Sequence, residues 1–394
     1  MGTVFRTLNL RGVSTRKIAA AVGIAQGRLY DYMNGKSRVE RLAMFEQIAD
    51  AFHIPGHRLG LARRPWEPEE SGPHAAPRTS FASPENDDDL ATMDAFRHAD
   101  RATGGGRLYT AVITHLREHV APRLVDLNSD HAFAAAAVLT EMAGWMAHDS
   151  GRDKVAEAHF TRAMPLAHAS GDTPLIANIA ASSSHLALQC GDPAAAAHWA
   201  RTGLDAVRKG MRVPTLIARL HTMQARALAA AGQHTAAESA LDQARAALRD
   251  APARVTHPWV SPFDSAALAS ETADALRDLG RLQQAVEYAQ LAVDQREAGR
   301  ARSLALSRIS LASLQLQCGN LDAALVVAEE LLAATAPTLG SVRVMRRLDS
   351  LSAQLEAHQS HRPARELLMR LTAERKTRML LLADILTSQG GQPV

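Results

Sequence analysis

The amino-acid sequence predicts an all-α protein in which a small helical N-terminal domain precedes a long solenoid of paired helices. Three observations lead to this fold class. Alanine is abundant while aromatic residues make up only 4% of the chain, a composition that favours closely packed helices. One pattern of glycine and small residues recurs at intervals near 40 residues. The chain of 394 residues is also long enough for two or more domains.

Charge is distributed unevenly along the chain. Residues 1–66 contain 11 Lys and Arg against 4 Asp and Glu, whereas the remainder contains 33 against 37. A small basic domain on a slightly acidic body indicates a polyanionic partner for the N-terminal domain alone. Because the sequence lacks a run of about 18 apolar residues and a secretory signal at its start, we expect a cytoplasmic protein without a membrane partner.

Residues 14–35 predict two short helices joined by a tight turn. Ser14 is a suitable N-cap, Gly23 permits the turn, and a second helix begins near Ala25 and stops at Gly35. Apolar residues of the two helices share one face: Ile18, Ala19, Val22, Leu29 and Tyr32. A third helix over residues 40–52 repeats apolar residues on one side and closes a small core.

This spacing resembles the phage-repressor (XRE-type) helix-turn-helix over about residues 5–60. The match is carried by Ser14, Ile18, Ala19, Val22, Gly23, Gln26, Leu29, Asn34 and Gly35. In that family the second helix enters the major groove of double-stranded DNA. The resemblance implies base-facing positions at Gln26, Gly27 and Asp31, and phosphate contacts at Thr15, Arg28, Asn34 and Lys36, with Arg16 adding charge nearby. Gln26 would suit bidentate reading of adenine.

Residues 65–100 are expected to form a flexible linker. Residues 65–90 contain five prolines, seven acidic residues and one basic residue, without a helical period. The segment either tethers the two domains or, being acidic, occupies the basic N-terminal domain when DNA is absent.

The remainder of the chain contains an internal repeat. A Gly is followed by a small residue five positions later and by apolar or small residues at nine and twelve. Copies start at Gly151, Gly191, Gly232, Gly280 and Gly319, and a degenerate sixth is centred on Gln359. Each Gly is predicted to end a first helix in a left-handed turn, and the small residue lets a second helix lie close. Because one such pair cannot bury its apolar faces alone, the pairs should stack into a solenoid.

These repeats resemble tetratricopeptide repeats over about residues 133–372. In the first copy Gly144, Ala156, Phe160 and Ala163 fall on the family's Gly, Ala, Phe and Ala positions. The resemblance implies an array of about six helix pairs over residues 101–388, with 107–127 as an additional leading helix. Since the period exceeds the family's usual length of about 34 residues, the helices should be longer.

In tetratricopeptide arrays, side chains on the inner face come from the first helix of each pair. The family's offsets map here onto Glu141, Trp145, His148, Asp149, Asn178, His185, Gln189, Arg219, Arg226 and Asp274, with Thr222, Ser270 and Arg277 beside them. These polar residues and one tryptophan predict a ligand groove, although a solvated surface would also account for many of them.

The order of domains looks like a large group of actinobacterial regulators. It is also similar in plan to the peptide-sensing quorum regulators of Gram-positive bacteria, whose array binds a signalling peptide and alters the dimer. The resemblance implies a homodimeric transcriptional regulator whose array binds a peptide, a small molecule or a partner protein. The alternative is an interaction scaffold whose N-terminal domain no longer binds DNA, since Gly27 and Asp31 depart from the family's pattern. The apolar face of residues 367–386 either caps the last repeat or pairs two chains.

Several patterns that suggest an enzyme have simpler interpretations. His115, Glu118 and His119 spell an inverted zinc-protease motif, but the α/β context of such proteases is absent. Gly104 begins a glycine run without the Lys-Ser/Thr of a phosphate loop. The two cysteines, Cys190 and Cys318, occur in nearly the same phrase and indicate a structural position beside a helix end. We therefore expect no enzymatic activity, no metal and no cofactor.

Overall fold

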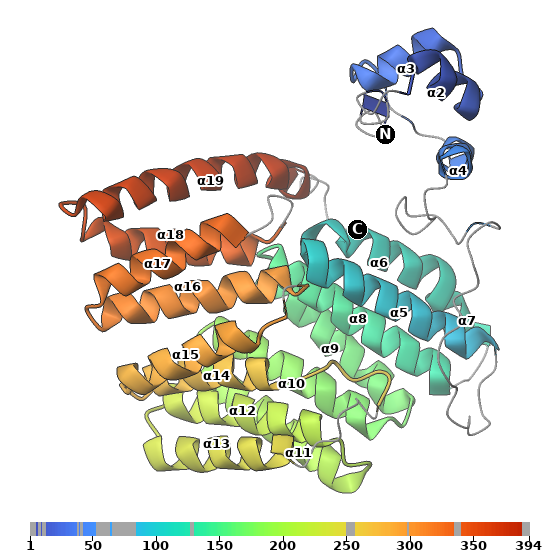
Figure 1. The fold of residues 1–394 in the computed structure, drawn as a ribbon. Coiled ribbons are helices and arrows are strands. Elements are labelled where there is room, and N and C mark those ends of the chain that lie inside the picture. Colours follow the sequence, from blue (N-terminus) through green and yellow to red (C-terminus); the bar gives the residue numbers. More distant parts are fainter. Residues whose placement is uncertain are drawn as a thin grey trace. The chain divides into compact units, whose positions relative to one another are not determined.

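A computed structural model of the chain describes residues 5–6, 9, 13–37, 39, 42–52, 64, 84–126, 130–249, 257–297, 299–334 and 340–387. Every regular element in these ranges is helical (Figure 1), which confirms the predicted all-α fold class. Contacts divide the chain into two units, Met1–Ser80 and Phe81–Val394. Within the described ranges, no helix is both long enough and apolar enough to span a membrane.

The first unit contains the predicted helix-turn-helix. Its helices are α2 (Thr15–Val22), α3 (Gln26–Met33) and α4 (Leu42–Ala51). The hydroxyl of Ser14 accepts a hydrogen bond from the Lys17 amide at 3.3 Å, as expected of an N-cap. Gly23 has φ of 68°, a left-handed conformation that lets the chain reverse between α2 and α3. The small core comprises Phe5, Ile18, Ala19, Val22, Leu29, Tyr32, Met33 and Ile48.

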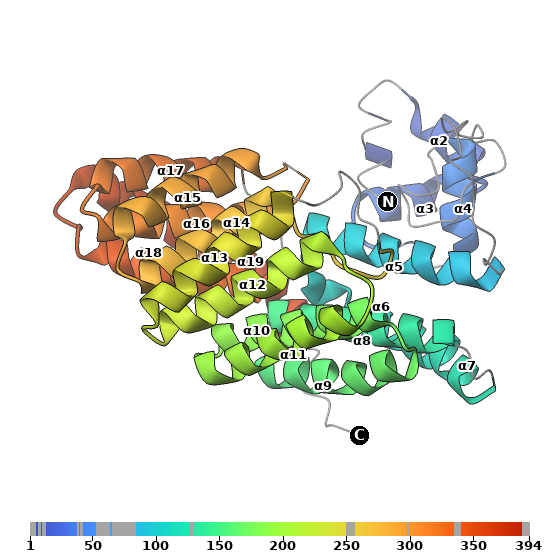
Figure 2. The ribbon, with the colours of Figure 1, turned by 90° about the horizontal axis from the view of Figure 1, so that it is seen from below.

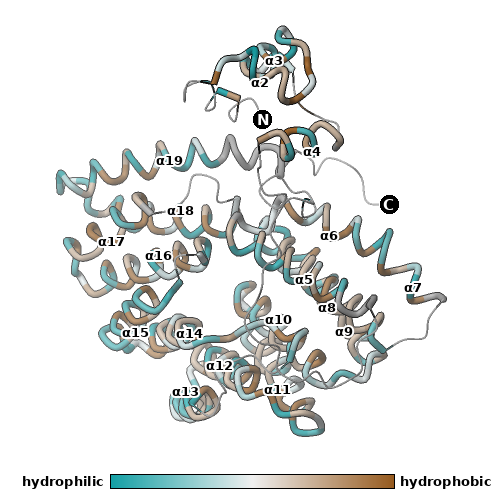
Figure 3. The backbone as a smooth tube through the Cα atoms, turned by 45° about the vertical axis from the view of Figure 1, so that its right-hand side comes forward, coloured by the Kyte–Doolittle hydropathy of each residue, from teal (hydrophilic) through white to brown (hydrophobic). Residues whose placement is uncertain are grey.

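The second unit contains the predicted array of paired helices. In the described residues the pairs are α8 (Asp130–Asp149) with α9 (Asp153–Ala169), α10 (Thr173–Gln189) with α11 (Pro193–Lys209), α12 (Pro214–Ala230) with α13 (His234–Arg249), α14 (Ser265–Asp278) with α15 (Leu282–Gln295), α16 (Ala301–Gln317) with α17 (Leu321–Ala334), and α18 (Val342–Glu356) with α19 (Arg362–Thr387). Hydrophilic and hydrophobic residues alternate along most of these helices (Figure 3), as stacked amphipathic helices require.

The repeat glycines act as the sequence predicts. At the end of α8, Gly151 has φ of 77°, its amide donates to the His148 carbonyl, and the Arg152 amide donates to the Ala147 carbonyl, both at 2.9 Å. This is the Schellman arrangement, which satisfies carbonyls that the helix leaves unpaired. Cys190 and Cys318 cap α10 and α16 directly before such glycines, which confirms their predicted position.

Close approach within a pair explains the residues that carry the repeat resemblance. A Cβ atom on Gly144 of α8 would lie 2.5 Å from Cε1 of Phe160 on α9. Phe160 is 2% exposed, and Ala156 and Ala163 on the same helix are fully buried. The absence of a side chain at Gly144 therefore allows the aromatic ring to fill the space between the helices.

The helices before the first pair correct the predicted extent of the linker. Helix α5 (Pro84–Thr103) begins inside the segment expected to be flexible, and its Met93 is 1% exposed in the core of the array. Asp89 accepts two hydrogen bonds from Arg123, at 2.8 and 2.6 Å, which anchors the acidic end of α5. The apolar spacing of α5 was concealed by its acidic composition. Residues 65–83 lie outside the described residues.

The predicted leading helix over 107–127 is present, as successive turns. After η2 (Gly105–Arg107), the chain continues through α6 (Tyr109–His115), the wider π-helical turn η3 (Leu116–Val120) and α7 (Ala121–Asp126). At the opposite end, Leu367 and Leu371 of α19 are 1% and 3% exposed against the last core cluster, so α19 caps the array. The side chains of 379–382, expected either to cap or to pair two chains, lie outside the described residues.

The array curls so that its first helices reach its last ones. Helix α5 contacts α16, and α8 contacts α18. The ribbon views show the repeats as successive layers around this curl (Figures 1 and 2). The first helices of the pairs consequently face a shared interior, where the candidate site lies.

Candidate functional site

Two adjoining cavities lie on the inner side of the array, and together we call them the inner groove. The first has a volume of about 420 Å³ and the second about 280 Å³, comparable to ligand pockets in other proteins. The wall between them is formed by five residues that line both: His185, Ala267, Glu271, Ser303 and Arg343. The inner groove therefore consists of two neighbouring cavities, separated by this wall and lined by residues of α5, α8, α10, α12, α14, α16 and α18.

Most of the sequence-predicted ligand residues line the inner groove. His185, Gln189, Arg226 and Asp274 line the first cavity, and Glu141, Trp145, His185 and Arg219 line the second. Ser270 and Arg277, from the same offsets, also line the first cavity. The rule that inner-face residues come from the first helix of each pair thus brings together residues that are far apart in sequence.

The floor of the second cavity is a hydrogen-bonded network around Glu141. This carboxylate is 2% exposed and accepts from the Asn178 amide nitrogen at 2.8 Å and from the Ser182 hydroxyl. Arg219 donates to the Asn178 amide oxygen at 2.8 Å and to Ser182 at 3.0 Å. Asn178 is fully buried and uses both ends of its amide within this network. We therefore correct its assignment from ligand contact to support of Glu141 and Arg219.

Trp145 borders the same cavity. Its indole nitrogen donates to Ser182 at 3.1 Å, which fixes the ring plane. The ring lies against Phe160 and His185, with centroid separations of 5.6 and 5.2 Å. The remaining surface of the indole supplies an apolar wall beside the charged network.

His148 and Asp149 also require a corrected assignment, because neither lines the groove. Asp149 is 2% exposed and accepts from Arg302 at 3.2 Å, from the Ser341 hydroxyl at 2.7 Å and from the Gly105 amide at 3.1 Å. Arg302 also donates to both carboxylate oxygens of Asp100, at 2.8 Å each. His148 is 5% exposed and lies 2.7 Å from Asp153.

We call Asp100, Asp149, Arg302 and Ser341 the Asp149 cluster. It joins α5 and α8 to α16 and to the start of α18, and so holds the curl of the array closed. Burial by itself would raise the pKa of Asp149, but the positive charges of Arg302 and Arg343 and the hydrogen bonds outweigh it and lower that pKa.

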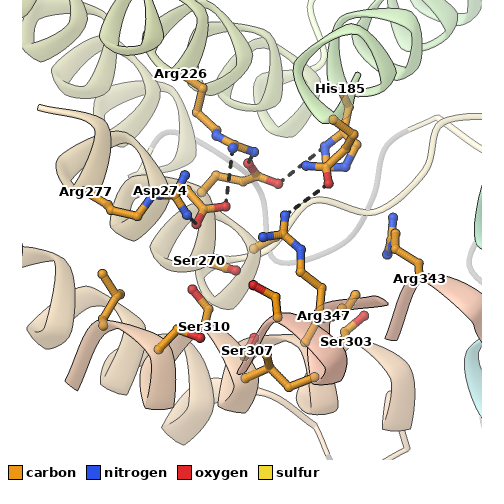
Figure 4. Close-up of a pocket in the computed structure, with 18 of the residues that line it drawn as sticks. His185, Arg226, Ser270, Asp274, Arg277, Ser303, Ser307, Ser310, Arg343 and Arg347 are labelled. Atoms are coloured by element: carbon orange, nitrogen blue, oxygen red, sulfur yellow. Dashed lines mark hydrogen bonds and ion pairs between the residues drawn. The ribbon is translucent and has the colours of Figure 1, made fainter. Parts of the chain in front are cut away.

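A second charged group occupies the first cavity. Arg226 donates to Glu271 at 2.6 Å and lies 3.4 Å from Asp274 (Figure 4). Burial alone would lower the pKa of Arg226, but these two carboxylates outweigh it and raise it. His185 lies 3.5 Å from Glu271, yet burial first, and then the charges of Arg343 and Arg226, place its pKa well below the ordinary value. His185 is therefore neutral at physiological pH.

The sequence did not predict some of the residues that line the inner groove. The unpredicted lining residues include four serines of α16 and two arginines of α18: Ser303, Ser307, Ser310, Ser313, Arg343 and Arg347. The recurrence of Ser at three- and four-residue intervals in α16 was a usable signal, because it places hydroxyls on one helical face. No comparable signal marks Arg343, which precedes the start of the last repeat copy.

In the first unit, the predicted DNA-contacting positions are accessible. Arg16, Gln26, Gly27, Arg28, Asp31, Asn34 and Lys36 are exposed, and Thr15 is half-buried. The side chain of Gln26 donates to the Thr15 hydroxyl at 2.9 Å, and Arg28 donates to the Tyr32 hydroxyl at 3.1 Å. The start of α3 therefore presents side chains that are already oriented by neighbours on α2 and α3.

His115 and His119, from the inverted zinc-protease pattern, have ring centroids 5.1 Å apart on the leading helix. The part of the chain that the structure describes contains no group of three or more His, Cys, Asp or Glu residues arranged to hold a metal.

The fold is similar to that of a solved structure, a Rap protein complexed with competence and sporulation factor. The two chains share 12% sequence identity with a TM-score of 0.50, and the match covers 86% of this chain and 93% of that one. At this identity the likeness shows the fold alone, a tetratricopeptide-like helical repeat array. The sequence matches no known family of proteins and no curated protein.

Proposed function

We propose that this protein is a transcriptional regulator whose N-terminal domain binds operator DNA and whose inner groove binds a peptide effector. The inner groove carries this proposal: its two adjoining cavities are of ligand size and are lined by charged side chains that remain partly accessible. An array of this length exceeds what DNA binding needs, since a small helix-turn-helix domain suffices for that. We assign the groove a binding role and no catalysis.

The structural neighbour supports an effector in the groove. That Rap protein was solved complexed with competence and sporulation factor, so a chain of similar fold binds a further molecule. In this chain an extended peptide would lie along the inner groove, with Gln189 and Ser270 within the first cavity and Trp145 in the second. For regulation, the effector must prefer one arrangement of the two N-terminal domains in a homodimer, because equal affinity for both would shift nothing.

The exposed face of α3 supports DNA binding by an XRE-type domain. Gln26, Arg28 and Asp31 of α3 are exposed, and so is Lys36 shortly after the helix. In this interpretation Gln26 reads a base edge, while the cations contact phosphates and set affinity.

The salt dependence of DNA binding tests this assignment. With the full-length protein and a DNA duplex of random sequence, Arg28→Ala and Lys36→Ala should each reduce the slope of log affinity against log salt by roughly 1, since one phosphate contact is lost. Arg208→Ala is the control, because Arg208 is an exposed cation of α11 in the array. Unchanged slopes in both variants would remove these residues from the DNA interface.

The second candidate function is an interaction scaffold, and two residues of α3 favour it. Gly27 offers no side chain and Asp31 would repel phosphates, and both are exposed on α3. Genome-wide mapping of DNA bound by the purified protein separates the two functions: defined sites support the regulator, and no enriched DNA supports the scaffold.

A further inference from the structure

The inner groove has an excess of positive charge. Among the described residues that line it there are ten arginines and only four carboxylates: Asp100, Glu141, Glu271 and Asp274. These carboxylates already have partners. Asp100 pairs with Arg302, Glu271 and Asp274 pair with Arg226, and Glu141 accepts from Asn178 and Ser182. Arg296 and Arg300 pair instead with Asp264, which does not line the cavities, and other arginines donate to neutral groups.

Hydrogen bonds to neutral acceptors fix three of these arginines. Arg219 donates to the Asn178 amide oxygen, Arg97 donates to the Trp259 carbonyl at 2.8 Å, and Arg347 donates to the Gln189 amide oxygen at 3.2 Å. Such bonds orient a guanidinium without balancing its charge. For Arg219 and Arg97, burial is the largest influence and lowers the pKa, although carboxylates oppose it, including Asp94 at 3.8 Å from Arg97.

Arg343 is only weakly compensated and lies at the wall shared by the two cavities. Its nearest carboxylate is Asp149, 4.0 Å from its Nε, and that carboxylate already accepts from Arg302 and Ser341. The Nε atom is buried without a hydrogen-bond partner, yet 21% of the side chain is exposed to the groove. Burial, with Arg302 nearby and only partly offset by Asp149, lowers the pKa of Arg343.

Arg343 and Arg347 are positioned to act on one ligand group. They are four residues apart on α18, so they lie on the same helical face. Figure 4 shows both side chains extending from α18 into the cavity, with Ser303 and Ser307 of α16 close to their base. Planar guanidinium groups bind the two oxygens of a carboxylate in a defined geometry, and a desolvated site strengthens that bond.

We propose that the effector of the inner groove is an acidic peptide, one carboxylate of which binds Arg343 and Arg347. This inference rests on the proposed function, because it names the chemical class of the effector. A peptide fits better than a small free acid because a second cavity adjoins the first at the shared wall, and there Trp145 and Arg219 offer an apolar surface and further positive charge to an extended chain. The serine hydroxyls of α16 supply hydrogen bonds to its remaining polar groups.

Peptide pools test the proposal. Three unlabelled pentapeptide pools with amidated carboxyl termini carry, at two fixed positions, Asp or Glu, the matching Asn or Gln, or Lys or Arg, so that only the first pool contains a carboxylate. After equilibrium dialysis with the full-length protein, mass spectrometry should show acidic peptides retained roughly tenfold or more over their amide counterparts, the typical effect of a charge-assisted pair. Free glutamate, as a small acid, should compete only weakly.

Variants locate the anion. Arg343→Gln and, separately, Arg347→Gln should each weaken binding of the best retained peptide roughly tenfold or more. Arg208→Gln removes the same charge from the outer surface of α11 and should leave affinity unchanged. Arg347 is exposed, so its variant keeps the test valid even if Arg343→Gln lowers stability.

The outcomes of these experiments distinguish a failure of the acidic-peptide proposal from a failure of the proposed effector binding. Equal retention of acidic and amide peptides, or full affinity in both variants, would overturn the acidic class while leaving a peptide-binding groove. Glutamate that binds as tightly as the peptides would overturn the peptide assignment. Retention of no pool at all would overturn effector binding itself and this inference with it.

Discussion

The Asp149 cluster and the shared wall of the inner groove each contain a largely buried arginine, but only the arginine of the cluster is closely paired with carboxylates. Arg302 in the cluster and Arg343 in the wall are both desolvated residues of inner helices, with 17% and 21% of the side chain exposed. Arg302 bonds two carboxylates at 2.8 and 3.2 Å, whereas Arg343 lies 4.0 Å from one carboxylate that is already occupied. Burial lowers the pKa of both guanidiniums; at Arg302 Asp149 and Asp100 outweigh it, and at Arg343 they do not.

This difference distinguishes structural arginines from ligand-binding ones. Neither residue type nor burial separates them, since both guanidiniums lie inside the curl of the array. What separates them is the number of carboxylates with which each guanidinium forms a close ion pair. A saturated pair contributes to holding the fold together, whereas an uncompensated cation gains most from an added anion.

The largest effect on stability should come from removing a carboxylate of the Asp149 cluster, where the charges are paired. Asp149→Asn removes the buried charge that Arg302 and Ser341 bind, which leaves Arg302 with Asp100 alone and Arg343 without its neighbouring carboxylate. Because removing one partner of a buried pair is costly, we expect the free energy of unfolding of the array to fall by about 3–5 kcal/mol. Urea unfolding followed by circular dichroism measures it, with Asp205→Asn as the control for an exposed pair on α11. A loss no larger than that of the control would show that the cluster does not hold the curl closed.

A second saturated carboxylate gives a pH-dependent effect. Burial would raise the pKa of Asp89, but His131, 3.4 Å away, and the hydrogen bonds from Arg123 lower it from 3.8 to about 2. The stabilisation is therefore complete above the ordinary pKa and is lost as pH falls toward 2. Asp89→Asn should cost about 2 kcal/mol at neutral pH. The gap between variant and wild type should narrow as unfolding is measured from pH 5 to pH 3; a constant gap would contradict the ion-pair explanation.

His185 provides a test of the positive charge at the shared wall of the inner groove. Burial, and then the charges of Arg343 and Arg226, hold its folded-state pKa well below 6.5, so the unfolded chain binds a proton first as the pH falls. Stability of the array should therefore decrease from pH 7 to pH 5, with a contribution from this residue. His185→Asn should remove that part of the pH dependence, and the exposed His168→Asn should not. An unchanged profile in His185→Asn would show that the groove does not repel the proton.

The smallest effect should come from removing the uncompensated cation. Arg343→Gln takes away a desolvated charge without breaking a close ion pair, so the Tm of the array should stay unchanged or rise slightly. Arg302→Gln, the matched variant in the Asp149 cluster, should lower it clearly. Differential scanning calorimetry of both variants checks the contrast, and equal losses would mean that Arg343 is as structural as Arg302.

For the helix pairs up to Asp274, the residues of the inner face could be predicted from the sequence. The cases in which this prediction failed are informative. Offsets taken from the repeat resemblance placed Trp145, His185 and Arg226 correctly at the groove, since a helix in a known register exposes known positions. The same offsets selected Asn178 and Asp149, which the structure buries in networks. Face and burial are separate properties: the first follows from helical period, and the second from what lies opposite.

The sequence by itself determined the helix pairs, their glycine turns and the helix-turn-helix, because these depend on contacts within about 40 residues and on the helical period. Only the tertiary structure decided which charged side chains support the fold and which line the groove. Asp149 meets Arg302 and Ser341 across 153 and 192 residues, and Arg302 meets Asp100 across 202. No repeat pattern encodes such pairings, since they arise from the accumulated rotation of successive pairs, which brings the two ends of the array together.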